Sequence, residues 1–107
     1  WEGYDTIAAS GPHACYLHWT RNDGAVLDGD LILIDAGAEA DSLYTADITR
    51  TLPVSGTFSD VQRRIYDTVV EAADAAFAAT KVGGVASRSA SACTASLHQR
   101  PSCGNMA

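Results

Sequence analysis

The chain has 107 residues, of which 47% are hydrophobic, and its formal net charge is −6. This length is enough for one small domain, and the negative charge argues against nucleic acid as a partner. No apolar run approaches the roughly 18 residues of a membrane-spanning helix, so no membrane association is expected. Because the chain starts at Trp1 without a signal-like leader, we expect it to be a piece of a longer protein.

The three cysteines give no sign of a metal site or a disulfide framework. Cys15, Cys93 and Cys103 show no metal-type spacing. An odd number of cysteines without a secretory signal favours reduced thiols, so the sequence predicts a cytoplasmic protein.

The first thirty residues predict short strands joined by turns. Residues 2–10 mix Tyr, Thr and Ile and end at Ser-Gly-Pro, which is typical of a strand followed by a turn. Residues 15–19 predict a second short strand. Turn signals at positions 22–24 (Asn-Asp-Gly) and 28–30 (Asp-Gly-Asp) then lead into a third strand.

Residues 31–54 predict two strands that each carry one aspartate inside an apolar run. Because side chains alternate along a strand, each aspartate shares its face with two other residues of its strand. These faces are Leu31, Leu33 and Asp35 on one strand and Asp47, Thr49 and Thr51 on the next. Gly37 and the Asp41-Ser42 pair supply turn chemistry, so we expect an antiparallel hairpin in which Asp35 faces Asp47.

A pair of carboxylates in a half-buried sheet points to a bound cation. Like charges there raise a pKa or recruit a positive ion. Oxygen ligands suit Mn, Mg or Ca, and with histidine added also Zn or Fe. The alternative is an exposed hairpin with two solvated aspartates. The apolar strands around Asp35 and Asp47 favour the metal site.

A helix is predicted from Ser59 to about Thr80. Ser59 and Gln62 have the spacing of a capping box. Apolar residues then recur at spacings of three and four, as on the buried face of a helix. They are Val61, Ile65, Val69, Ala72, Ala73, Ala76 and Phe77. We expect this face to pack on the back of the sheet and Gly83 and Gly84 to end the helix.

The composition changes after this helix. All 13 acidic residues lie before position 75, and residues 85–107 show neither a strand nor a helix period and few large aliphatic residues. Such a segment buries too little apolar surface to order itself. We therefore predict a domain over residues 1–82 and a disordered tail over residues 83–107.

The two predicted hairpin strands carry a specific family resemblance. Ile-Asp-Ala-Gly at positions 34–37 is followed by Ala-Asp-Ile-Thr-Arg-Thr-Leu-Pro-Val at positions 46–54. This pair resembles the metal-binding hairpin of the pita-bread metallopeptidases, and the resemblance extends over residues 3–82. Within that family the chain is most similar to Xaa-Pro aminopeptidases (aminopeptidase P), then to prolidases. Its two aspartates are separated by one residue more than in many members, and we expect the turn to absorb it.

The resemblance implies an α+β fold, in which a curved antiparallel sheet with one covering helix forms the first half of a pita-bread catalytic domain. It implies that Asp35 chelates one divalent ion and that Asp47 bridges two, most often manganese in this family. The family's other ligands are one His and two Glu. After Asp74 this chain offers only His98 and no carboxylate side chain, so we expect it to be inactive alone.

The resemblance also implies roles for three further residues. Tyr4 and His18 match the aminopeptidase P pattern, in which a strand with Tyr leads to Ser-Gly and then to Leu-His-Trp. His18 is thereby expected to contact the substrate and to help to stabilise the transition state, whereas Tyr4 and Thr49 orient the metal-binding carboxylates. Without the resemblance, a histidine before Trp19 is more often a packed or surface residue, and His13 is left as structural.

The implied function is release of the N-terminal residue from peptides with proline in second position, by a parent enzyme that we expect to be a homo-oligomer. Prolidase activity is the alternative within the family. A non-catalytic pita-bread module that binds peptides or a partner is expected to lack the ligand aspartates. A methionine aminopeptidase shares them but fits the residues around them less well, and a calcium-binding hairpin needs a denser run of oxygen ligands.

The point at which the resemblance stops raises a question about the tail. The Ala-, Gly-, Val- and Asp-rich first part indicates a GC-rich gene, in which a shifted reading frame yields Ser, Arg, Ala, Cys and Pro. Linkers seldom interrupt a sheet domain halfway through its metal site. The sequence therefore predicts that residues from about Gly84 onward are frameshifted or foreign to the domain.

Overall fold

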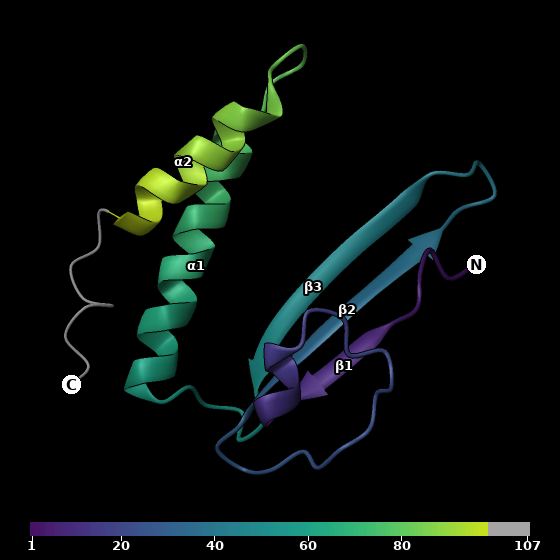
Figure 1. The fold of residues 1–107 in the computed structure, drawn as a ribbon, viewed down its shortest axis with the longest axis vertical. Helices are drawn as coiled ribbons and strands as arrows, with labels where there is room; N and C mark the ends of the chain where they lie inside the picture. The colour runs from purple at the N-terminus through teal and green to yellow at the C-terminus, as the bar shows by residue number, and fades with distance from the viewer. Residues whose placement is uncertain (99–107) are drawn as a thin grey trace. The chain divides into compact units, whose positions relative to one another are not determined.

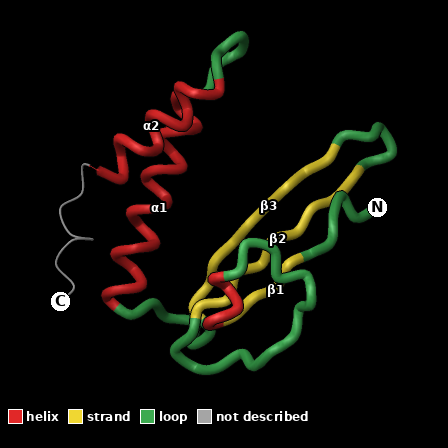
Figure 2. The backbone as a smooth tube through the Cα atoms, in the orientation of Figure 1, coloured by secondary structure: helices red, strands yellow, loops and turns green. Residues whose placement is uncertain are grey.

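The structure is a computed structural model that describes residues 1–98, and it divides into two units. Residues 1–58 form a three-stranded antiparallel sheet, and the chain from Ser59 forms a helical hairpin (Figure 1). Along the chain (Figure 2), the elements are β1 (Ile7–Ser10), η1 (Gly11–Cys15), β2 (Leu31–Glu39), β3 (Thr45–Pro53), α1 (Asp60–Ala79) and α2 (Ala86–His98). The α+β class is confirmed, with a second helix beside the single helix expected. Neither described helix has the length and hydropathy needed to cross a lipid bilayer.

The central hairpin of β2 and β3 forms as predicted. Nine residue pairs run without interruption from Leu31 and Pro53 to Glu39 and Thr45. The turn of residues 40–44 closes them, with the Leu43 N–H donating to the Ala40 carbonyl over 2.8 Å. The pairing of β2 with β3 contains no bulge. The additional residue between Asp35 and Asp47 is therefore accommodated in this turn. Gly37, expected in the turn, lies within β2.

The predicted strand over residues 2–10 forms in two pieces. Glu2 makes an isolated bridge to Ala38, and β1 pairs with β2 from Ile7 opposite Asp35. Five positions separate Glu2 from Ile7, whereas only three separate their partners. Two additional residues therefore bulge out of the first strand between these pairings, and Tyr4 lies in this bulge. Bulges of this kind redirect a side chain, which matters for the site described below.

The predicted strand over residues 15–19 is wrong. The chain leaves β1 through Gly11, whose φ is +53°, and Pro12 follows at the start of η1. Proline suits the first turn of a helix because its ring fixes φ and its nitrogen has no hydrogen to leave unpaired. A single-turn bond from the Tyr16 N–H to the His13 carbonyl, at 3.0 Å, completes η1. Residues 15–19 do not pair with the sheet, and the ring of Trp19 stacks on that of His13.

The capping box of α1 is confirmed. The Gln62 N–H donates to Ser59 Oγ over 3.3 Å, and the Ser59 N–H donates to Gln62 Oε1 over 2.9 Å. Two amide hydrogens that helix geometry leaves unpaired are thereby satisfied. The helix ends at Ala79, and its buried residue is Ala72, which is 2% exposed.

The expectation of a disordered tail is wrong for residues 86–98, which form α2. Alanine has the highest helix propensity, and small residues recur at helical spacing along the half-buried side of α2. These residues are Ser89, Ala92, Cys93 and Ser96. The turn before α2 contains Gly83 with φ of +74°, and α2 runs back along α1. Residues 99–107, for which the same prediction was made, lie outside the described residues.

We expect Ser59→Ala to lower the free energy of unfolding of the helical unit by about 1 kcal/mol, because it removes the cap of α1. Urea titration followed by circular dichroism at 222 nm measures this change. Ser91→Ala is the matched control, since Ser91 is an exposed interior residue of α2, where alanine is favoured. Equal effects of the two substitutions would contradict the assignment of the cap.

Candidate metal centre

The sheet register places Asp35 and Asp47 on the same face of the β2–β3 hairpin. Asp35 lies opposite Thr49, and Asp47 lies opposite Gly37. Residues that pair across an antiparallel sheet share a face, as do residues two apart on one strand. The two aspartates are therefore diagonal neighbours, offset by two positions, and do not lie directly opposite each other as the sequence suggested.

Tyr4 joins the two carboxylates. Its hydroxyl oxygen lies 2.5 Å from Asp35 Oδ1 and 2.8 Å from Asp47 Oδ1. The tyrosine comes from the bulge that precedes β1, so three separate segments of the chain meet at this point. Tyr4 thus contacts both predicted metal ligands, the arrangement expected of a residue that orients them.

Gly37 provides the space in which the Tyr4 ring lies. A Cβ atom added at Gly37 would lie 2.2 Å from Tyr4 Cε1 and 2.7 Å from the Ala46 carbonyl oxygen. Any larger residue would therefore displace the ring from its position between the aspartates. The turn role predicted for this glycine is therefore wrong. The signal available for its actual role was its position inside the apolar strand, where glycine often marks a close approach of other groups.

The site has an excess of negative charge among its described residues. A phenol carries one hydrogen, so the Tyr4 hydroxyl donates fully to only one carboxylate at a time. Desolvation, the hydrogen bonds to Asp35 and Asp47, and the charges of those carboxylates all raise the pKa of Tyr4 well above its usual range. The hydroxyl therefore stays protonated at neutral pH and lies between two acceptors.

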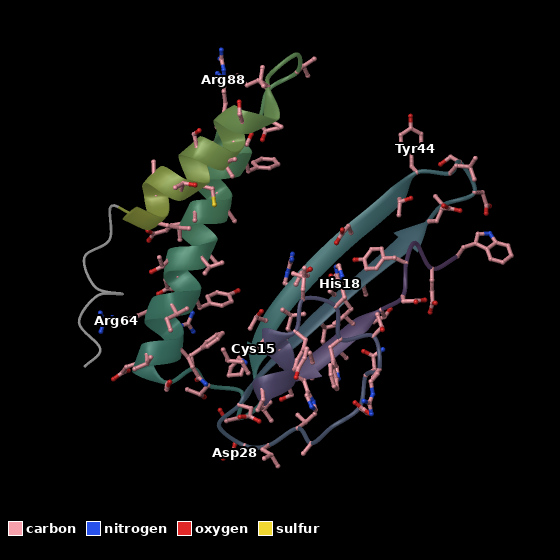
Figure 3. All side chains as sticks on the ribbon, in the orientation of Figure 1. Cys15, His18, Asp28, Tyr44, Arg64 and Arg88 are labelled. Carbon is pink, nitrogen blue, oxygen red and sulfur yellow. The ribbon has the colours of Figure 1, made fainter. Side chains whose placement is uncertain are left out.

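The other two predicted site residues do not contact this cluster. Thr49 lies beside Asp35 in the sheet, but no hydrogen bond joins its side chain to either aspartate in the part of the chain that the structure describes. His18 is exposed and lies on the segment between η1 and β2 (Figure 3). Their assigned roles remain predictions.

The described residues supply two carboxylates as candidate metal ligands and no complete ligand set. Within residues 1–98, no group of three or more His, Cys, Asp or Glu side chains is close enough to hold a metal ion. Asp35 and Asp47 are hard oxygen donors, which suit divalent ions such as magnesium, calcium or manganese. Their shared orientation and uncompensated charge fit part of such a centre.

A paired-carboxylate hairpin on a curved antiparallel sheet is the class of site expected in the pita-bread metallopeptidases. Metallopeptidase family M24 matches the chain over residues 1–104. The chain belongs to this family.

Among its relatives are Xaa-Pro aminopeptidases. Xaa-Pro aminopeptidase 1 of Streptomyces coelicolor is 59% identical over 81 residues, and the Xaa-Pro aminopeptidase of Escherichia coli is 54% identical over 68 residues. These alignments cover 76% and 64% of this chain but only 16% and 15% of the relatives. The chain therefore spans about a sixth of the length of the relatives it matches.

Solved structures give the same relationship. A histidine-to-alanine variant of Escherichia coli aminopeptidase P superposes with a TM-score of 0.67 at 49% identity, over 71% of this chain and 17% of that one. A zinc-substituted form of the same enzyme in complex with product matches equally well. The resemblance inferred from the hairpin sequence is thus confirmed in both sequence and fold.

We expect Tyr4→Phe to show how much the Tyr4 hydroxyl contributes to the free energy of unfolding, and how this contribution depends on pH. Because the pKa of Tyr4 is higher in the folded chain than in the unfolded chain, its contribution to stability is present below about pH 10. It is lost as the pH rises through the folded-state pKa. The difference in free energy of unfolding between wild type and Tyr4→Phe, measured by urea titration with EDTA present, should therefore be constant up to about pH 10 and shrink above it.

Tyr44→Phe is the control for this experiment, because Tyr44 is 82% exposed in the hairpin turn. Tyr44→Phe should change the free energy of unfolding little, as expected for an exposed side chain. A difference for Tyr4→Phe that stays constant through the alkaline range would contradict the assigned hydrogen bonds.

Proposed function

We propose that the full-length protein releases the N-terminal residue from peptides with proline in second position, and that this chain contributes part of its metal centre. The observation that carries this proposal is the Tyr4 hydroxyl held between Asp35 and Asp47, in a chain of which 81 residues align with an Xaa-Pro aminopeptidase at 59% identity. Residues 1–82 would form the first part of the catalytic domain. Prolidase activity finds no specific support among the structural observations.

Asp35 and Asp47 would hold two divalent ions, with Asp47 shared between them. The two-position offset between the aspartates supports these different roles, since one carboxylate follows the other along the same face of the hairpin. A histidine and two glutamates from outside this chain would complete the ligand set, in which the carboxylate oxygens are the majority and suit manganese. When bound, such ions activate a water molecule and polarise the scissile carbonyl.

The protein residues around the ions would position the two carboxylates and stabilise the charge that develops on the substrate. Tyr4 keeps the two carboxylates at a fixed separation through its hydroxyl, and Gly37 keeps the Tyr4 ring in place. Thr49, next to Asp35 across the strands, would limit the movement of that carboxylate. His18, exposed on its loop, would hydrogen-bond the substrate carbonyl oxygen, where negative charge develops during attack.

We expect Asp47→Asn in the full-length enzyme to abolish turnover of an Xaa-Pro peptide and to reduce the bound metal below one ion per chain. The amide removes the charge of the shared ligand, whereas loss of an orienting residue such as Tyr4 costs about 10–100-fold in metal affinity or activity. Metal analysis and kcat are measured together. Asp41→Asn, an exposed change in the hairpin turn, is the control. An Asp47→Asn enzyme with two metals and near-normal kcat would disprove the assignment.

We expect His18→Ala to lower kcat by about 10²–10³-fold, the loss seen when a donor to a developing oxyanion is removed. The metal content should stay at the wild-type level, because His18 is proposed to contact substrate and not metal. Loss of metal in this variant would instead identify His18 as a ligand and contradict its proposed role.

A further inference from the structure

Among the described residues, the outer edge of β1 is paired by a side chain and not by another strand. The Ala8 N–H donates to Asn22 Oδ1 over 2.6 Å, and Asn22 Nδ2 donates to the Thr6 carbonyl over 2.8 Å. A neighbouring strand would make this same pair of bonds. The amide of Asn22 thus fixes the segment between η1 and β2 to the outer edge of the first strand.

The backbone at position 22 requires a residue of this type. Asn22 has a φ of +52°, in the left-handed region that asparagine enters more readily than most residues. One residue therefore supplies both the reversal of the chain and the two hydrogen bonds to the strand. The turn signal at positions 22–24 predicts the reversal of the chain but not the two hydrogen bonds to the strand.

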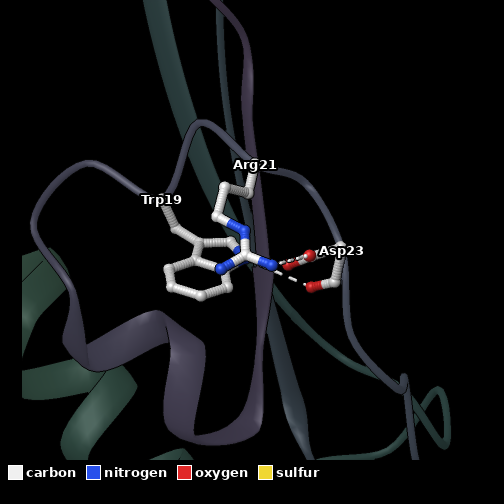
Figure 4. Close-up of polar contacts among 3 residues, drawn as sticks. All are labelled: Trp19, Arg21 and Asp23. Carbon is white, nitrogen blue, oxygen red and sulfur yellow. Dashed lines mark hydrogen bonds and ion pairs between the residues drawn. The ribbon is translucent and has the colours of Figure 1, made fainter.

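The residues around Asn22 make the segment a compact unit. The Trp19 ring stacks on His13 at 4.0 Å between centroids, and the Trp19 Nε1–H donates to the Asp23 carbonyl over 3.2 Å. Arg21 lies over Trp19 and forms an ion pair with Asp23 at 2.7 Å (Figure 4). These contacts are internal to the segment or reach η1, which packs against β1 and β2. The Asn22 amide adds the hydrogen bonds that join the segment directly to the outer edge of β1.

The two segments that these bonds join each carry a predicted site residue. His18 immediately precedes Trp19, and Thr6 is two residues from Tyr4, whose hydroxyl contacts the carboxylate pair. We propose that Asn22 is a positioning residue, which holds the His18 segment in a fixed place relative to Tyr4, Asp35 and Asp47. This inference rests on the proposed function, in which His18 contacts the substrate.

Asn22→Gly in the full-length enzyme tests the inference. Glycine accepts the φ of +52° without strain, so the change removes only the amide. We expect kcat for an Xaa-Pro peptide to fall roughly 10–100-fold, the scale of loss when a reacting group is misplaced by about 1 Å. KM and metal content should be unchanged. Asp28→Asn is the matched control, because Asp28 is an exposed residue of the same connection and lies outside the contacts around Trp19.

A double-mutant cycle separates positioning from a general loss of structure. If Asn22 acts through His18, Asn22→Gly should cause no further loss of kcat in a His18→Ala enzyme. A structural defect unrelated to His18 would instead multiply the two losses. Multiplied losses, an unchanged kcat in Asn22→Gly alone, or metal loss in that variant would each overturn the inference.

A second measurement keeps the inference distinct from the proposed function. If the wild-type protein cleaves no Xaa-Pro peptide, the proposed function fails, and the position of His18 is then followed by NMR with labelled histidine. Asn22→Gly should shift the His18 imidazole signals and raise the exchange rate of the Ala8 amide hydrogen, whereas Asp28→Asn should do neither. Unchanged His18 signals in Asn22→Gly would overturn the inference independently of any activity.

Discussion

Two carboxylates that share a single hydroxyl hydrogen impose the main constraint on the sheet unit. The Tyr4 hydroxyl reaches both Asp35 and Asp47 only because the first strand bulges between its pairings to Ala38 and Asp35. The Tyr4 ring then has to cross β2, and it does so where Gly37 has no side chain. The irregular pairing of the first strand and the glycine inside the second are thus explained by one interaction.

The same first strand is held from both sides. β2 pairs with its inner edge, and the amide of Asn22 occupies its outer edge, which would otherwise present unpaired backbone groups. A four-residue strand at a sheet edge makes few hydrogen bonds of its own, so these contacts limit its movement. Tyr4 is therefore attached to a segment fixed at two edges, and this allows its hydroxyl to keep the aspartates in place.

Sequence patterns predicted those features that depend on neighbouring residues. The alternation around Asp35 and Asp47 and the Ser59-Gln62 cap are local, and both are observed. The two-position offset between the aspartates was missed because it depends on how the turn closes. The Asn22 bonds join residues 14 and 16 positions apart, and no periodicity indicates them. α2 was missed because its helical period is carried by small residues, whereas the prediction considered large aliphatic ones.

The charge balance of the site favours the proposed metal-dependent function over a purely structural role for the hairpin. Two solvated aspartates would need no partner, yet both direct an oxygen at one phenol, whose pKa is raised by desolvation and by these two carboxylates. One hydrogen satisfies a single acceptor and leaves both negative charges in place, so the arrangement orients the pair without neutralising it. Repulsion between carboxylates held in this way decreases when a cation binds, and the oxygen donors suit a hard divalent ion. Tyr4 would thus prepare the ligands before the ion arrives, and the fixed edge of β1 would supply the rigidity that this preparation requires.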